Sequence, residues 1–338
     1  MVDYLISISS DVVANMVIAS TVLIGIAAYH LPRRKKMRRF FGLDRGAEVQ
    51  IVLSNIWVEK SRGVTAVSVG HLGSAGSLGE YLSASALART VERDSGVPRV
   101  LQFFVNTGED GSRRYGRARV EIRMSPRYVD DSAQPSSAAT FAELPAQCRK
   151  DTVDLLSGDR TVILAGSQVY NAAVLYMSEA IGARPAADGG VSLVRSIVDG
   201  GVTRSVVRIG TRELVRGAES DPAEEYQEYF IVRRVKLPHT VFLCSGMSTV
   251  STGLALRALS DWAELAEEVG QEPFVAVYEV SGITRQQAND EKYIDVAKVR
   301  RLHLAKTPDA GPAKAVPRQS RRSVTQHVEN PVEETGDV

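Results

Sequence analysis

Three turns rich in small residues follow short apolar segments, and their residue types suit the binding of an anion. The turns are Gly70–Gly79, Gly166–Asn171 and Ser245–Gly253. At a strand-to-helix turn, the N–H groups of the first helical turn have no partner within the helix and favour phosphate groups. Glycine lets the backbone approach a ligand, and hydroxyl or amide side chains can hydrogen-bond to phosphate or ribose oxygens. We predict ligand contacts at nine positions: Gly76, Gly79, Gly166, Ser167, Asn171, Ser245, Gly246, Ser248 and Thr252.

None of these turns carries a known phosphate-binding signature. Glycine recurs at every third position from Gly70 to Gly79, which does not match G-x-G-x-x-G, and no lysine stands in P-loop spacing. In the alternative interpretation, glycine ends a strand and Ser, Thr or Asn only caps the following helix. The sequence leaves both interpretations open.

Candidates for catalysis are few. Cys244 precedes Ser245 and Gly246, but the flanking glycines of a nucleophile elbow are missing, so we interpret it as a small buried apolar residue. Glu80 and Glu279 are acids placed to act as a ribose acceptor or a general base. The five His residues show neither H-x-x-H nor H-E-x-x-H spacing, so we predict no metal site. We assign no catalytic residue.

The elements that would position these residues repeat along the chain. A short buried strand, a turn and an amphipathic helix recur near residues 64–94, 161–181 and 240–269. Such βα units stack into a mostly parallel sheet, because parallel strands need crossover connections. The segments between Val191 and Val235 predict additional antiparallel strands. The predicted fold class is α/β, a Rossmann-like mostly parallel sheet with helices on both faces plus antiparallel strands, preceded by one transmembrane helix.

Hydrophobic patterning places the individual elements. The predicted strands are Glu48–Leu53, Gly63–Val69, Val100–Val105, Arg117–Met124, Thr161–Ala165, Ser192–Ile197, Thr203–Ile209, Glu228–Val235, Thr240–Cys244, Phe274–Val280 and Tyr293–Leu304. The predicted helices are Glu80–Arg93, Gln147–Leu156, Ala172–Ile181 and Leu254–Val269.

The segment Val12–Leu31 has the character of a membrane span. It contains no Asp, Glu, Lys or Arg, and at about 1.5 Å per residue it spans the roughly 30 Å of a hydrocarbon core. A cleavable signal peptide would carry its cations before the apolar segment, whereas here they follow it. A buried core helix or an interfacial helix should show a polar stripe, and no charged face exists here.

A basic collar follows the apolar segment directly. The positive-inside rule places the N-terminus outside and the body in the cytoplasm of a cell membrane. The cations could also attract anionic lipid headgroups, at roughly 1 kcal/mol each. The collar consists of Arg33, Arg34, Lys35, Lys36, Arg38 and Arg39.

Composition narrows the class of protein. The 338 residues carry a formal charge of +1, and setting the six collar cations aside leaves −5, so we predict no nucleic-acid partner. Two cysteines exclude a disulfide-rich scaffold. The chain holds 32 Arg and only 9 Lys, which favours a bacterial or phage genome of high GC content.

Changes in composition divide the chain into five parts. Residues 1–41 form the anchor and basic segment, 42–126 a first α/β lobe and 127–146 a Pro/Ser/Ala-rich linker. Residues 147–306 form a second α/β lobe. Residues 307–338 form a tail without core-forming residues, which we predict to be disordered.

The layout resembles membrane-anchored bacterial Rossmann-like proteins that sense nucleotides, in the neighbourhood of the SLOG and TIR families. The resemblance rests on this architecture and on the turns Val162–Asn171 (VILAGSQVYN) and Phe242–Gly253 (FLCSGMSTVSTG). The glycine-rich SLOG loops and a TIR-type glutamate are absent, so no catalytic residue is carried over. The resemblance implies a cytoplasmic body that binds a nucleotide.

The sequence therefore predicts a membrane-anchored sensor or effector that binds a nucleotide or another phosphorylated small molecule at its strand-to-helix turns. Binding would bias the orientation or the self-association of the body, so a homo-oligomer is an expected partner state. Two alternatives stay open. One is an enzyme that processes a nucleotide or sugar by hydrolysis or glycosyl transfer, and the other is a membrane scaffold for a protein partner.

Overall fold

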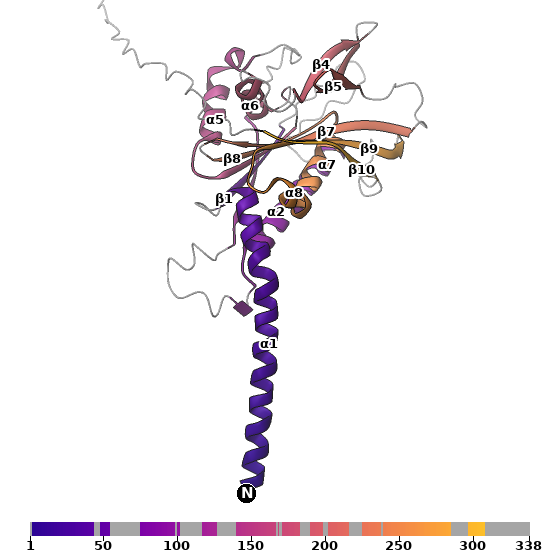
Figure 1. Cartoon of the computed structure of the whole chain (residues 1–338). Coiled ribbons are helices and arrows are strands. Elements are labelled where there is room, and N and C mark those ends of the chain that lie inside the picture. The colour runs from indigo at the N-terminus through magenta and orange to yellow at the C-terminus, as the bar shows by residue number, and fades with distance from the viewer. Residues whose placement is uncertain are drawn as a thin grey trace, which may run out of the picture.

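The computed structural model describes most of the elements predicted from the sequence (Figure 1). The described residues are 2–43, 48–54, 75–98, 100–101, 117–126, 140–166, 168, 171–182, 190–198, 202–215, 225–237, 239–284 and 297–307. The predicted strand Gly63–Val69 and most of the predicted linker and tail lie outside these ranges.

A seven-stranded mixed sheet forms the centre of the body, in the order β10-β9-β7-β8-β3-β1-β2. Four adjacent strands pair in parallel: β8, β3, β1 and β2. Antiparallel pairing adds β7, β9 and β10 at the other side. The strands are β1 (Glu48–Leu53), β2 (Arg119–Met124), β3 (Thr161–Ala165), β7 (Glu225–Lys236), β8 (Thr240–Gly246), β9 (Phe274–Thr284) and β10 (Lys298–Lys306).

Burial follows position in this sheet. Every residue of β3 and β8 is buried, as expected for central strands that are covered on both faces, whereas the edge strand β2 alternates between exposed and half-buried residues. Since β1 pairs with both β2 and β3, strands from both predicted lobes lie side by side in one sheet.

Helices cover both faces of the sheet. On one face, α2 (Ala75–Ser95), α7 (Thr249–Ser260), α8 (Trp262–Val269) and the end of α1 enclose the largest hydrophobic cluster. On the other face, α5 (Ala146–Leu156) and α6 (Ala172–Gly182) pack beside the parallel strands, next to the 3-10 turn Phe141–Glu143. An α/β fold with a mixed sheet, in which most strands run in one direction, is therefore confirmed.

A second, three-stranded antiparallel sheet packs on the same face as α5 and α6. Its strands are β4 (Ser192–Val198), β5 (Val202–Ile209) and β6 (Arg212–Val215). Val207 and Leu214 of this sheet share a buried cluster with β7 and β9 of the large sheet. The predicted antiparallel strands at 192–197 and 203–209 are confirmed here, while residues 228–235 belong to β7 of the large sheet.

One helix, α1 (Val2–Phe41), extends from the body as a shaft (Figure 1). Among the described residues it is the one helix long and apolar enough to cross a membrane, and its most apolar window is not buried against the body. Its exposed large apolar side chains are Val12, Val13, Met16, Val17, Ile18, Val22, Ile24, Tyr29 and Leu31.

The shaft continues without interruption into the hydrophobic core. Met37, Phe40 and Phe41 of its last turn are buried among residues of the sheet and of α8. The helix ends in a Schellman motif, in which Leu43 N donates to Arg38 O at 2.8 Å and Gly42 N to Arg39 O at 3.2 Å. Gly42 adopts φ +68°, the left-handed conformation that this motif requires.

Two predicted elements differ from the structure. The predicted helix 254–269 is two helices, because Asp261 ends α7 and begins α8, and aspartate favours helix ends over helix interiors. The predicted strand 100–105 is wrong at Val100 and Leu101, which are helical, and its other residues lie outside the described ranges.

Candidate functional site

The turn between β3 and α6 is closed by its own side chains. Asn171 is fully buried, and its Oδ1 accepts from Ala173 N at 3.0 Å and from Val174 N at 3.2 Å, while its Nδ2 donates to Ala165 O at 2.8 Å. Ser125 Oγ accepts from Ala172 N at 3.1 Å. The first amide donors of α6 are therefore satisfied within the protein.

Gly166 in the same turn is required by close packing. It adopts φ +114°, and a Cβ added there would lie 1.8 Å from Ser54 Oγ. The predicted contact Ser167 lies outside the described residues. The structure thus brings Gly166 and Asn171 together, as expected, and gives both of them a part in closing the turn.

The turn between β8 and α7 is closed in a related way. Ser248 is the N-cap of α7, and its Oγ accepts from Ser251 N at 3.2 Å and donates to Glu228 Oε2 at 2.6 Å. Glu228 is fully buried. A carboxylate of the protein therefore lies at the helix N-terminus, the position that a phosphate would favour.

The other predicted contacts in this turn are tightly packed. Thr252 Oγ1 donates to Ser248 O at 2.8 Å, and a Cβ at Gly246 would lie 2.4 Å from Thr252 N. Ser245 is buried in β8. Ser245, Gly246, Ser248 and Thr252 thus gather at one end of the sheet, as expected for a strand-to-helix turn.

Gly76 and Gly79 lie inside α2, rather than in the turn that the sequence predicts. A Cβ at Gly253 of α7 would lie 3.3 Å from Ser83 Oγ and 3.5 Å from Gly79 O, so α2 and α7 pack closely at Gly253. The glycine repeat resembled a loop because helix propensity disfavours glycine, and helix–helix packing outweighs that propensity here.

The candidate acids and the cysteine are buried inside the body or paired with its residues. Glu279 accepts hydrogen bonds from Arg300 Nε at 2.9 Å and from Arg300 Nη2 at 2.5 Å. Glu80 is buried in α2, and burial raises its pKa to about 8. Cys244 is fully buried in the core, and burial raises the pKa of its thiol. Within the described ranges, no three His, Cys, Asp or Glu residues gather as a metal site would require.

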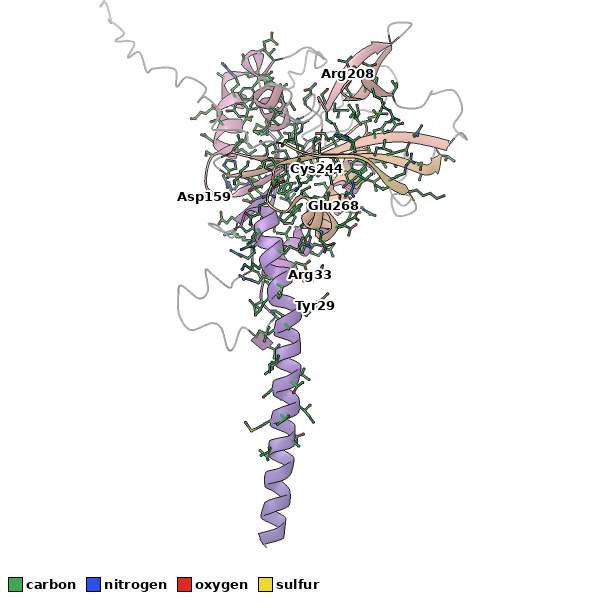
Figure 2. All side chains as sticks on the ribbon, viewed as in Figure 1. Tyr29, Arg33, Asp159, Arg208, Cys244 and Glu268 are labelled. Carbon is green, nitrogen blue, oxygen red and sulfur yellow. The ribbon has the colours of Figure 1, made fainter. Side chains whose placement is uncertain are left out.

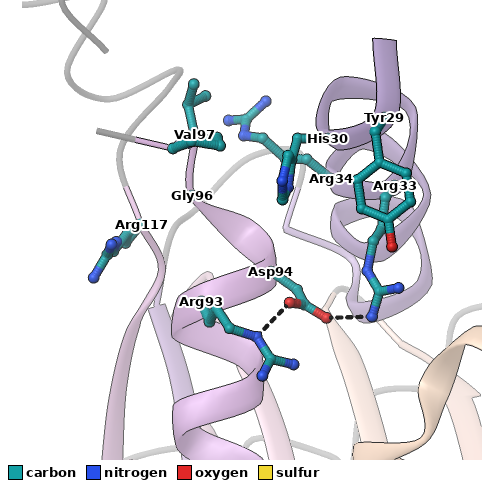
Figure 3. Close-up of a pocket in the computed structure, with 10 residues that line it drawn as sticks. Tyr29, His30, Arg33, Arg34, Arg93, Asp94, Gly96, Val97 and Arg117 are labelled. Carbon is teal, nitrogen blue, oxygen red and sulfur yellow. Dashed lines mark hydrogen bonds and ion pairs between the residues drawn. The ribbon is translucent and has the colours of Figure 1, made fainter. Parts of the chain in front are cut away.

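A pocket of about 470 Å³ lies where α1 joins the body, and we refer to it as the junction pocket (Figure 3). Three segments of the chain line it: the end of the apolar shaft with the first collar residues, the end of α2 with the residues after it, and Arg117, two positions before β2. Its lining residues are Tyr29, His30, Arg33, Arg34, Arg93, Asp94, Gly96, Val97, Pro98 and Arg117.

Positive charge dominates the junction pocket. Four arginines and one aspartate line it, so the lining carries a formal charge of +3 when His is counted as neutral. Asp94 Oδ2 accepts from Arg33 Nη2 at 3.1 Å and from Trp262 Nε1 at 3.1 Å, and its Oδ1 accepts from Arg93 Nε at 2.8 Å. Burial opposes the ionisation of Asp94, but these hydrogen bonds outweigh it and hold its pKa below the usual value.

The body also positions the remaining arginines. Arg34 Nε donates to Ser95 O at 2.8 Å. The stem of Arg117 crosses Gly96 so closely that a Cβ there would lie 2.4 Å from Arg117 Cγ. Ser95 Oγ accepts from Ala118 N at 2.7 Å, which ties the end of α2 to the residues before β2. These contacts position arginines of α1 and of the segment before β2 along the lining of one pocket.

The collar is only partly available to a membrane surface. Arg38 is buried and donates to Leu43 O at 2.6 Å, while Lys36 pairs with the exposed Glu267 at 2.8 Å. Lys35 and Arg39 are exposed. Figure 2 shows Arg33 on the shaft near the body and Tyr29 farther from it. Most of the collar therefore serves first to attach the shaft to the body.

Sequence patterns missed Asp94, Arg93 and Arg117 as site residues. Arg93 and Asp94 are neighbours in the last turn of a helix and Arg117 stands shortly before a strand, and none of them belongs to a motif. A basic juxtamembrane segment was the one available signal, and it marked only the α1 side of the pocket.

Comparison with protein families, curated proteins and solved structures finds no match for this chain.

Proposed function

We propose that this chain is a single-pass membrane protein that works as a sensor or effector for a phosphorylated ligand. In this proposal α1 crosses the cell membrane with its N-terminus outside, and the α/β body, Rossmann-like in the broad sense, lies in the cytoplasm. The ligand is a nucleotide or another molecule that presents a phosphate group.

The main support for the proposal is that α1 runs as one helix from its apolar part into the core of the body. A helix of 40 residues has its apolar part free of the body and its last turn, with Phe40 and Phe41, in the body's core. A flexible linker would separate the body from the span mechanically, and here none intervenes. A change at the junction would therefore alter the angle between body and membrane, which is the kind of response that a membrane-bound sensor needs.

The charge distribution supports the orientation. Lys35 and Arg39 extend from the collar into solvent, and the junction pocket adds Arg93 and Arg117 at the same end of the apolar segment. Cations on one flank of a span favour the cytoplasmic side.

The junction pocket, rather than the strand-to-helix turns, suits the ligand better. At α6 and α7, Asn171 and Ser248 satisfy amide donors, and Glu228 adds a negative charge beside α7. In the junction pocket, by contrast, four arginines face one carboxylate. Guanidinium groups bind phosphate with paired, charge-assisted hydrogen bonds.

Two measurements on the full chain test this function. After expression in bacteria, the protein should stay in the membrane fraction through high-salt and alkaline washing and be released only by detergent. A reporter enzyme that is active only outside the cytoplasm should work when fused to the N-terminus and fail when fused to the C-terminus. Release without detergent would overturn the anchoring, and the reverse reporter pattern would overturn the orientation.

The ligand class is tested separately. The purified chain in a neutral detergent is screened by thermal shift against nucleotides, sugar phosphates and inorganic phosphate, with uncharged sugars as controls. Any ligand that binds the folded state alone raises the melting temperature by mass action. A shift that needs the phosphate group supports the proposal, and equal shifts with the uncharged controls would contradict it.

A further inference from the structure

We infer that the junction pocket binds the phosphate of an anionic lipid headgroup from the membrane that α1 crosses. This inference rests on the proposed function and identifies the source of its phosphorylated ligand.

The depth of the pocket matches the headgroup layer. The apolar segment Val12–Leu31 is centred about 12 residues before Arg33 and Arg34, a distance of about 18 Å along a helix. The hydrocarbon core ends about 15 Å from the bilayer centre and the headgroup layer at about 20–22 Å. A helix tilt of about 20° reduces the 18 Å to about 17 Å. The arginines therefore lie at the level of the lipid phosphates.

Cations from both the shaft and the body line the pocket at this level. Arg33 and Arg34 come from α1, while Arg93 lies in the last turn of α2 and Arg117 precedes β2. The side chain of Arg93 is 69% exposed and so can turn towards an incoming phosphate. Asp94 is 7% exposed and accepts from Arg33, Arg93 and Trp262, so it balances one of the four positive charges and leaves the lining with a net positive charge.

The neighbourhood favours a lipid over a soluble ligand. Tyr29 is 62% exposed on the shaft and lines the pocket on its membrane side, and tyrosine is enriched at membrane interfaces. The apolar surface of α1 continues directly below it, with Ile24 and Val22 exposed. A phosphate in the pocket would leave its acyl chains along this surface. A free nucleotide would have to displace lipid to reach the same position.

An occupied pocket would connect the shaft and the body. One phosphate group can accept hydrogen bonds from guanidinium groups of both α1 and the α2–β2 side. Bound lipid then adds to the Arg33–Asp94 ion pair in holding the body at one angle to the membrane. Basic pockets at the cytoplasmic end of a span are a recurrent solution for headgroup recognition.

The test uses the full chain, stripped of lipid in a neutral detergent. The probes are dioctanoyl phosphatidylglycerol, its zwitterionic phosphatidylcholine counterpart, and glycerol 3-phosphate as the free phosphate. The readouts are the shift in melting temperature and the number of bound lipids in native mass spectrometry. We expect phosphatidylglycerol to bind at least tenfold more tightly than either of the other probes.

Two variants separate the pocket from general attraction to charge. Arg117→Gln removes a pocket cation and keeps most of the stem over Gly96, while Lys35→Gln removes an exposed collar cation outside the lining. We expect Arg117→Gln to weaken phosphatidylglycerol binding three- to tenfold and Lys35→Gln less than twofold. Arg93→Gln is a second pocket variant, expected to behave as Arg117→Gln if the latter folds poorly.

The outcomes are distinguishable. Equal losses in the pocket variants and Lys35→Gln, or equal binding of phosphatidylcholine, would overturn the inference. Equal binding of glycerol 3-phosphate with the same dependence on Arg117 would also overturn it, but would leave the proposed function in place. If no phosphate-bearing probe binds, including the nucleotides of the earlier screen, both the inference and the proposed ligand class fail.

Discussion

Arg33 on α1 and Asp94 at the end of α2 form an ion pair, with 3.1 Å between Nη2 and Oδ2. The same oxygen accepts from Trp262 Nε1 of α8, and the Arg33 guanidinium lies 5.6 Å from the centre of the Trp262 ring. A residue predicted to face lipid thus connects the shaft to two helices of the body. The stability of this joint and its pH dependence can be tested directly.

Asp94→Asn is expected to lower the free energy of unfolding by about 1–2 kcal/mol, because it removes the charged acceptor of three hydrogen bonds, while the cations that remain, Arg33 and Arg93, stay in contact with solvent. The matched control is Glu267→Gln, which breaks the exposed Lys36–Glu267 pair between α1 and α8 and should cost less than about 1 kcal/mol. Thermal melting of both variants in detergent checks the difference. Equal losses of unfolding free energy in the two variants would mean that the burial of Asp94 does not strengthen its ion pair.

Glu80 should make the protein less stable as the pH rises. Burial raises its folded-state pKa from 4.5 to about 8, so between these values the unfolded chain releases a proton that the folded chain keeps. This group's stabilising contribution is complete below pH 4.5 and is lost as the pH approaches 8, at up to about 1.4 kcal/mol per pH unit. Glu80→Gln should flatten that dependence, as measured by melting temperature between pH 5 and 8. An unchanged slope would exclude Glu80 as its source.

Gly42→Ala should destabilise the joint by about 1–3 kcal/mol through backbone strain alone. Gly42 adopts φ +68°, and a Cβ there would lie 2.0 Å from Thr240 Oγ1. Gly25→Ala is the control on the same helix, where a new Cβ meets nothing within 4 Å. We expect the melting temperature to fall only for the first variant; a fall of similar size in both would contradict the role of the Schellman motif.

Gln50→Met should leave stability unchanged or raise it by about 1 kcal/mol. Gln50 is buried in β1, and within the described part of the chain neither its Nε2 nor its Oε1 has a hydrogen-bond partner, so the replacement removes a desolvation penalty without breaking a bond. Asn171→Leu is the contrasting variant, because Asn171 Oδ1 caps α6, and it should cost about 2 kcal/mol or more. Chemical or thermal unfolding measures both. A clear loss in Gln50→Met would show that its amide has a role.

Truncation should reveal where the body begins. A chain that starts at Pro32 keeps Met37, Phe40 and Phe41 and is expected to fold, whereas one that starts at Gly42 loses all three from the core. Each lost large side chain costs about 2–5 kcal/mol, so the loss of three is about as large as the whole stability of an ordinary domain. Circular dichroism and size exclusion distinguish a folded monomer or oligomer from an aggregate. A cooperative, folded chain from Gly42 would refute the dependence on α1.

The strands and helices could be predicted because their signals are local. The bounds of β1 and β3 agree with the predicted strands residue for residue, since short β-branched segments between turn residues leave little ambiguity. The apolar segment from Val12 was recognised from its length and lack of charge alone. By contrast, a pattern of apolar residues cannot tell a membrane from a core, so Phe40 and Phe41 were grouped with the anchor and belong to the body.

The sequence by itself therefore determined the α/β class, the order of most elements and the one candidate membrane span, because hydrophobic period and turn chemistry act over a few residues. Only the tertiary structure decided that Glu228 reaches the N-cap Ser248 of α7, and that Arg33, Asp94 and Arg117 meet in one pocket. These residues lie tens of residues apart along the chain. Their meeting depends on how helices pack on the sheet, and no local pattern records that packing.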